Sequence, residues 1–136
     1  MSRRKSRIIA FQALYSWDAS GESVENLLQF SWVDSKENLE QSDLAFSRII
    51  IAGTIENISA IDEIIKNHLS ANWNFDRLNK VTLAILRISV YSLMYQKDIA
   101  PSIVIDEAVD LSKEFGVSDS FKFINAMLDR ISKEGK

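Results

Sequence analysis

The sequence predicts an all-α protein, and three observations lead to this fold class. Four Gly and one Pro in 136 residues leave few positions that would break a helix. Apolar residues recur at helical spacing along almost the whole chain, without the sustained period of two that marks strands. The chain is 46% hydrophobic, which is enough for one well-buried core, and its 136 residues are too few for two ordinary domains. We therefore expect a compact single domain over residues 1–136.

The apolar spacing predicts about seven helices, and several of their boundaries carry the residues that start or end helices. The expected ranges are about 3–18, 23–31, 43–56, 59–69, 80–96, 101–115 and 119–133. Ser59 with Asp62 matches a capping box at the start of the fourth helix. Pro101 suits a first helical turn, and Gly116 suits the position after a helix end. The one long loop is expected around the polar residues 34–42.

The fifth helix is expected at the centre of the core, because the segment from Val81 to Tyr95 is apolar around nearly its whole circumference. Arg87 lies inside this run, where its guanidinium needs a carboxylate or a route to solvent. We therefore favour an internal ion pair, with Glu107 as a candidate partner, over a contact with a ligand.

Positive charge is concentrated at the N-terminus. Residues 1–7, which we call the basic arm, contain Arg3, Arg4, Lys5 and Arg7 and no acidic residue, although the net charge of the chain is -3. Such a cluster suits phosphate groups, which arginine contacts with two parallel N–H donors. The alternative is a solvated tail without a ligand.

The helical wheel places the arm over a stripe that becomes core further along the first helix. Arg7 shares the angular sector of Leu14, and Arg4 falls between Phe11 and Tyr15. We therefore expect the first two turns to overhang the bundle or to be disordered. Tyr15 at the root of the arm suits stacking on a base of single-stranded nucleic acid. Its alternative role is a core aromatic with its hydroxyl at the surface.

The last helix shows a second candidate surface. Its predicted buried stripe comprises Phe121, Ile124, Met127, Leu128 and Ile131. Lys122 and Asn125 lie on the opposite side, and Phe123 lies at the edge between the two. Phe123 is therefore a candidate platform for a base, with packing against the core as the alternative.

Enzyme chemistry has little support in this sequence. The chain has one His and no Cys, and no GxSxG, Walker A or GxGxxG pattern occurs. Asp106, Asp110 and Glu114 line up on one helix face, which is more often a solvated face than a metal site. We expect no cofactor. The absence of cysteine favours a reducing cytoplasm, and no apolar stretch reaches the length of a membrane-spanning helix.

Several stretches, in the same order and spacing, resemble the NusB family of bacterial transcription antitermination factors. They are RRKSR (3–7), ALYSW (13–17), LAILRISVYSLMY (83–95), IVIDEAVDLSKEFG (103–116) and DSFKFINAMLD (119–129). The resemblance implies an all-α fold of two small helical bundles. It also implies that the arm binds boxA-type RNA and that the partner is NusE, a small-subunit ribosomal protein, within the RNA polymerase antitermination complex.

The resemblance also supplies candidate site residues. Those on the RNA side are Arg3, Arg4, Lys5, Arg7, Tyr15, Lys122, Phe123 and Asn125, with Asp119 close to that surface. Thr82 and Leu83 stand where the family usually has an acidic and then a basic residue, on the helix implicated in binding NusE. Asp106 likewise replaces a usual Asn. With Thr82 as the candidate contact, we expect affinity for NusE to be weaker or differently built.

Together with the basic arm, the resemblance implies a non-enzymatic adaptor that joins boxA-type RNA to NusE in ribosomal RNA transcription. One alternative is an RNA-binding domain related to those of ribosomal RNA methyltransferases. Another is a helical scaffold that binds only proteins. Such a scaffold would show no salt-dependent affinity for RNA, whereas the adaptor requires it.

Overall fold

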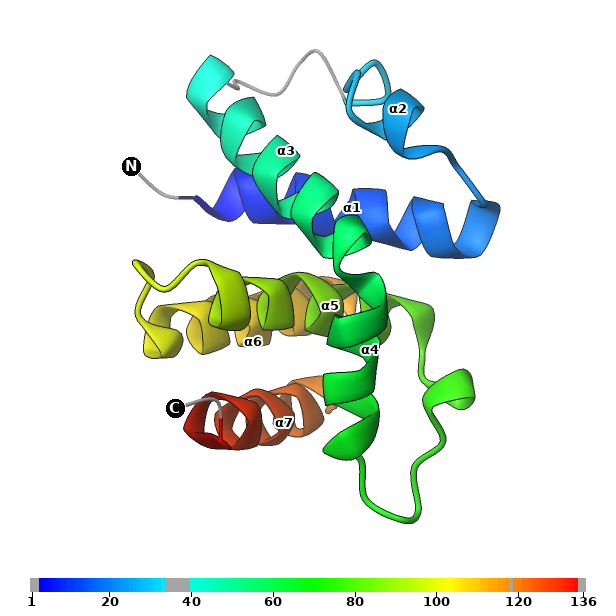
Figure 1. The fold of residues 1–136 in the computed structure, drawn as a ribbon, viewed down its shortest axis with the longest axis vertical. Coiled ribbons are helices and arrows are strands. Elements are labelled where there is room, and N and C mark those ends of the chain that lie inside the picture. The colour runs from blue at the N-terminus through cyan, green and yellow to red at the C-terminus, as the bar shows by residue number, and fades with distance from the viewer. Residues whose placement is uncertain (1–2, 34–39, 118, 135–136) are drawn as a thin grey trace.

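The computed structural model describes residues 3–33, 40–117 and 119–134, and this part of the chain is all-helical (Figure 1). Its elements are α1 (Arg4–Ser20), α2 (Val24–Leu27), α3 (Gln41–Glu56), α4 (Ile58–Asn67), the short 3-10 helix η1 (Phe75–Arg77), α5 (Lys80–Tyr95), α6 (Pro101–Phe115) and α7 (Ser120–Glu134). The prediction of an all-α fold with seven helices is confirmed, although α2 is a single turn.

The helices form two small bundles, and α5 contacts helices of both. In Figure 1, α1, α2 and α3 make the upper group, and α4, α5, α6 and α7 make the lower one. α5 packs against α1, α3, α4, α6 and α7. Every residue of 82–93 is buried, so the prediction of a central fifth helix is confirmed.

Helix α5 starts at a well-formed cap. The side chain of Asn79 accepts hydrogen bonds from the backbone N–H groups of Val81 and Thr82, at 2.9 and 3.2 Å. This satisfies two of the donors that a helix N-terminus leaves unpaired. The cap fixes the point at which the chain leaves the loop and enters the core.

Arg87 is internal and ion-paired, as its position predicts, but its partner is not Glu107. Its Nε and Nη2 donate to the two carboxylate oxygens of Asp62 on α4, both at 2.9 Å. Its Nη1 lies 3.6 Å from the carboxylate of Asp18, which Lys80 also reaches at 3.1 Å. The guanidinium thus ties α5 to α4 and α1 beneath the rings of the neighbouring aromatic side chains, Trp17 and Phe75.

Helix α3 approaches α5 closely at Gly53. A Cβ atom at this position would overlap the ring of Tyr91, so the packing of the two helices requires glycine here. Tyr91 is 9% exposed, and burial raises the pKa of its hydroxyl, with a further contribution from Glu56.

One local expectation from the sequence is wrong, and another falls largely outside the described residues. Ser59 and Asp62 do not form a capping box, because α4 begins at Ile58 and the carboxylate of Asp62 is engaged by Arg87. A capping box occurs instead at α3, between Glu40 and Asp43. The expected long loop at 34–42 falls largely on residues 34–39, outside the described ranges.

A second long connection joins α4 to α5. The chain from 68 to 79 contains only the short helix η1 and forms the extended loop at the lower right of Figure 1. Pro101 at the start of α6 and Gly116 at its end confirm the predicted boundaries there. In the described ranges, no single helix is long and apolar enough to cross a membrane, and α3 with α4 meets that test only as a pair bent by 74°.

Candidate nucleic-acid interface

The described part of the basic arm is the first turn of α1 and does not overhang the bundle. Ser6 is fully buried, and its hydroxyl donates to the backbone carbonyl of Asp43 at 2.9 Å. The hydroxyl of Ser47 in turn donates to the backbone carbonyl of Ser6 at 2.9 Å. These bonds hold α1 against α3, so the expected overhang or disorder is wrong for residues 3–7. Met1 and Ser2 lie outside the described residues.

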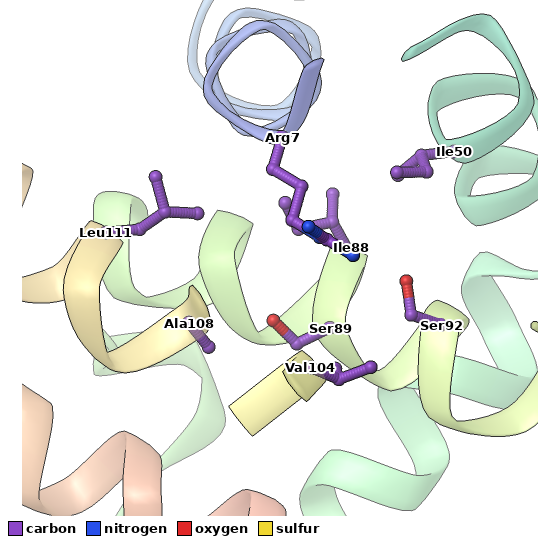
Figure 2. A pocket seen from close by; sticks show the side chains of 8 residues that line it. All are labelled: Arg7, Ile50, Ile88, Ser89, Ser92, Val104, Ala108 and Leu111. Carbon is purple, nitrogen blue, oxygen red and sulfur yellow. The ribbon is translucent and has the colours of Figure 1, made fainter. Parts of the chain in front are cut away.

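Arg7 is buried, although the helical wheel argued against an arginine at this position. It is 8% exposed, and Figure 2 shows its side chain extending from α1 toward α5. The charged end borders a cavity of about 10 Å³ whose other lining residues are Ile50, Ile88, Ser89, Ser92, Val104, Ala108 and Leu111. Nη1 lies 3.5 Å from the Glu107 carboxylate, and burial lowers the pKa of the guanidinium while Glu107 partly restores it.

Arg4 and Arg3 each have partners within the protein. Nη2 of Arg4 lies 2.7 Å from the carboxylate of Asp110 and 3.1 Å from that of Glu107, and these contacts raise the pKa of Arg4. Arg3 donates to the backbone carbonyl of Ser42 at 3.2 Å, and its guanidinium lies over the Phe46 ring, 4.6 Å from the centroid. Acidic side chains of α6 thus neutralise part of the arm's charge.

An open groove of about 580 Å³ runs beside the arm. It is lined by Arg3, Arg7, Phe46, Asp98, Ile99, Ile103, Asp106 and Glu107. The three carboxylates make the groove unfavourable for phosphate groups. The outward side of the arm, where Arg4 and Lys5 are exposed, is the more suitable surface for an RNA backbone.

The acidic row on α6 is partly engaged by the arm. Asp110 pairs with Arg4 at 2.7 Å, as described above. Within the described ranges, no group of three His, Asp or Glu side chains is arranged to hold a metal ion.

The candidates on α7 divide into exposed polar residues and one packed aromatic. Lys122 and Asn125 are exposed, whereas Phe123 is half-buried and packs against the core. The Phe123 ring also contacts Trp73 of the α4–α5 loop, with 4.7 Å between centroids. Sequence reasoning missed Trp73, because helical periodicity gives no information about a loop residue.

Tyr15 is 39% exposed, so it is a surface residue of α1 and not a core aromatic. One helical turn before it, Phe11 contacts Phe115 at the end of α6, with 5.0 Å between ring centroids. Gly116 follows the end of α6, and α7 begins at Ser120. Tyr15 therefore lies one helical turn beyond a contact between α1 and the C-terminal end of α6.

Thr82 is 4% exposed in the first turn of α5, and its backbone N–H is bonded to the Asn79 cap. Leu83 beside it is 5% exposed. A partner that docks at this turn would first meet the exposed side chains of Asn79 and Lys80. Thr82 as a contact for NusE stays a prediction.

Comparison with known proteins supports the resemblance. A family model described as NusB family matches residues 4–133. The chain is similar to the transcription antitermination protein NusB of Treponema denticola, with 51% identity over 134 residues and 98% of both chains covered. The corresponding protein of Leptospira biflexa is 38% identical over 133 residues, with 98% of this chain and 93% of the relative covered.

Solved structures agree in fold. The chain resembles T. maritima NusB with a TM-score of 0.88 and 36% identity, covering 98% of this chain and 92% of the other. It also resembles a chain in the crystal structure of antitermination factors NusB and NusE in complex with dsRNA. In that comparison the TM-score is 0.84 and the identity 32%, covering 98% of this chain and 99% of the other. The matched residues, the identities and the shared fold establish that this chain belongs to the NusB family.

Proposed function

We propose that this protein is a non-enzymatic transcription antitermination factor. It binds boxA-type RNA together with the ribosomal protein NusE, as part of the RNA polymerase antitermination complex in ribosomal RNA transcription, in the cytoplasm. The observation that carries the proposal is the likeness, over 98% of this chain, to a chain solved in a complex of NusB, NusE and dsRNA. The curated relatives bear the name of transcription antitermination protein NusB and are spanned nearly whole, which favours the adaptor over a methyltransferase domain.

The residues divide this task by chemistry. Lys5 and Arg4 are exposed on the outward side of α1 and supply positive charge for phosphate groups. Tyr15 and the α7 residues Lys122, Phe123 and Asn125 lie beyond the arm and supply the groups that meet bases. Phosphate contacts position the RNA and base contacts specify its sequence, so the two surfaces are expected to affect affinity and preference separately.

The salt dependence of RNA binding tests the proposal. We expect the double substitution Arg4→Gln with Lys5→Gln to weaken binding to all single-stranded RNAs. The slope of log affinity against log salt should flatten by about 1.4, since each phosphate contact on a single strand contributes roughly 0.7. Titration of boxA and scrambled RNA at several salt concentrations, with and without NusE, measures both quantities. Substitution of exposed side chains is a cleaner test than deletion of residues 2–7. Deletion would also remove Ser6 and Arg7, which are buried, and would therefore disturb the packing of α1.

Arg48→Gln serves as the matched control, because Arg48 is an exposed cation of α3 that belongs to neither proposed RNA surface, and its guanidinium lies over the Phe30 ring, 5.2 Å from the centroid. It should leave the slope unchanged. A wild-type protein with no salt-dependent affinity for RNA would instead support a scaffold that binds only proteins. An unchanged slope in the arm variant would remove Arg4 and Lys5 from the RNA contact.

The pairing of Arg4 with α6 leads to a second prediction. Asp110→Asn removes a carboxylate charge that lies 2.7 Å from the Arg4 guanidinium. In the wild type, RNA phosphates must compete with this carboxylate for Arg4. We expect RNA affinity at low salt to rise about 2- to 5-fold, the magnitude of one exposed ion pair. The gain should disappear at high salt because the contact is screened. Glu25→Gln on α2, which removes an exposed carboxylate outside both proposed RNA surfaces, is the control, and a fall in affinity for Asp110→Asn would contradict the prediction.

A further inference from the structure

The α4–α5 loop presents a tryptophan to solvent. Trp73 is 52% exposed, which is unusual for so large an apolar side chain. Its backbone N–H donates to the carbonyl of Ser70 at 3.0 Å, so the residue lies at the end of a formed turn. The loop is anchored to α7, because Arg130 donates to the backbone carbonyl of His68 at 2.9 Å.

Trp73 covers part of Phe123. Their ring centroids lie 4.7 Å apart, and the two planes are tilted by 35°. Phe123 itself is half-buried and packs on its other side against the core. The aromatic surface that this pair offers to a ligand therefore belongs mainly to Trp73, and Phe123 supports it from beneath.

A groove of about 400 Å³ lies beside the exposed indole. Its lining residues are Lys66, Leu69, Ser70, Ala71, Asn72, Trp73, Asn74 and Phe75. They combine an aromatic face, amide side chains and a cation, since the Lys66 ammonium lies 4.9 Å from the centroid of the Phe75 ring. Unpaired nucleotides are bound by these same groups, with stacking on the base, hydrogen bonds to its edge and a positive charge near its phosphate.

We propose that Trp73 is a base-stacking residue, and that an unpaired nucleotide of the bound RNA stacks on its indole with the base edge toward the groove. This inference rests on the proposed function, because it assigns the groove to the same RNA. The argument for RNA as occupant is continuity: Phe123 belongs both to the aromatic pair and to the α7 surface, where Lys122 and Asn125 are exposed. The RNA-binding face then extends from α7 onto the α4–α5 loop.

Replacement of Trp73 tests the inference. Trp73→Leu should weaken binding of boxA RNA roughly 5- to 150-fold, the range for loss of one stacked base, whereas Trp73→Phe should retain most of the affinity. Trp32→Leu is the matched control, because Trp32 is 38% exposed but precedes α3 in the other bundle. It should leave RNA affinity unchanged.

Abasic RNA separates stacking from a structural effect on Phe123. A series of boxA RNAs, each lacking one base, should include one position whose loss weakens binding to the wild-type protein but not to Trp73→Leu. Equal penalties at every position in both proteins would overturn the inference. So would a variant that loses affinity for NusE alone, since the groove would then bind protein.

These outcomes are distinguishable from failure of the proposed function. If Trp73→Leu binds RNA like the wild type while the Arg4 and Lys5 variant loses salt dependence, the inference is wrong and the RNA-binding function stands. If the wild-type protein binds neither boxA nor scrambled RNA, the proposed function itself is wrong.

Discussion

Arg87→Leu is expected to lower the free energy of unfolding by about 3 kcal/mol, because it removes one partner from a largely buried ion pair. The Arg87 side chain is 7% exposed and that of Asp62 is 18% exposed. Without the guanidinium, the Asp62 carboxylate loses two charge-assisted hydrogen bonds of 2.9 Å and stays in a poorly solvated position. Urea denaturation followed by circular dichroism measures the change.

Two further variants show whether the loss comes from the pair itself. The double variant Arg87→Leu with Asp62→Leu should recover a large part of the stability, because no charge is then left without a partner. Lys80→Met removes the more exposed partner of Asp18, and it should cost less than about 1 kcal/mol. Wild-type stability in Arg87→Leu would contradict the geometry described here.

The pairing of Arg87 follows from the sequence, but the identity of its partner does not. An arginine in an apolar helix must be paired, whatever the fold, because of the cost of burying its charge. Which carboxylate pairs with it depends on how α4 crosses α5, and apolar periodicity does not specify helix crossing. Asp62 is the partner, and Glu107 instead meets Arg7 and Arg4 on the other side of the core.

The fold class and the central helix could be predicted because they depend on periodicity alone. The predicted overhang of the arm is wrong for a physical reason: a helical wheel treats an arginine as polar throughout, whereas its aliphatic stem can cover apolar surface. The small side chain of Ser6 also lets α1 approach α3, which the wheel does not register. In the candidate site, the exposure of Tyr15, Lys122 and Asn125 matches the predicted surface, but Trp73 lies in a loop without period.

Arg7→Ala tests the division of the arm into a buried cation and exposed ones. We expect it to lower the free energy of unfolding by about 2–4 kcal/mol, as for truncation of a large core side chain. The substitution removes a stem that fills space beside an existing cavity of about 10 Å³, and it also breaks the 3.5 Å contact with Glu107. Arg4→Gln, at an exposed position of the same turn, should cost less than about 1 kcal/mol. Urea denaturation of both variants provides the comparison.

Arg7→Met keeps most of the stem and removes the charge, which makes it the decisive variant for function. Since Arg7 is 8% exposed, its guanidinium does not reach an RNA backbone in this conformation, and the salt slope of RNA binding should stay as in the wild type. If Arg7 contacts RNA, as the family resemblance implies, the slope should instead flatten by about 0.7. A flattened slope together with unchanged stability would mean that α1 releases Arg7 from Glu107 when RNA binds. An unchanged slope with reduced stability would assign Arg7 to the core, and the phosphate contacts of the arm to its exposed neighbours.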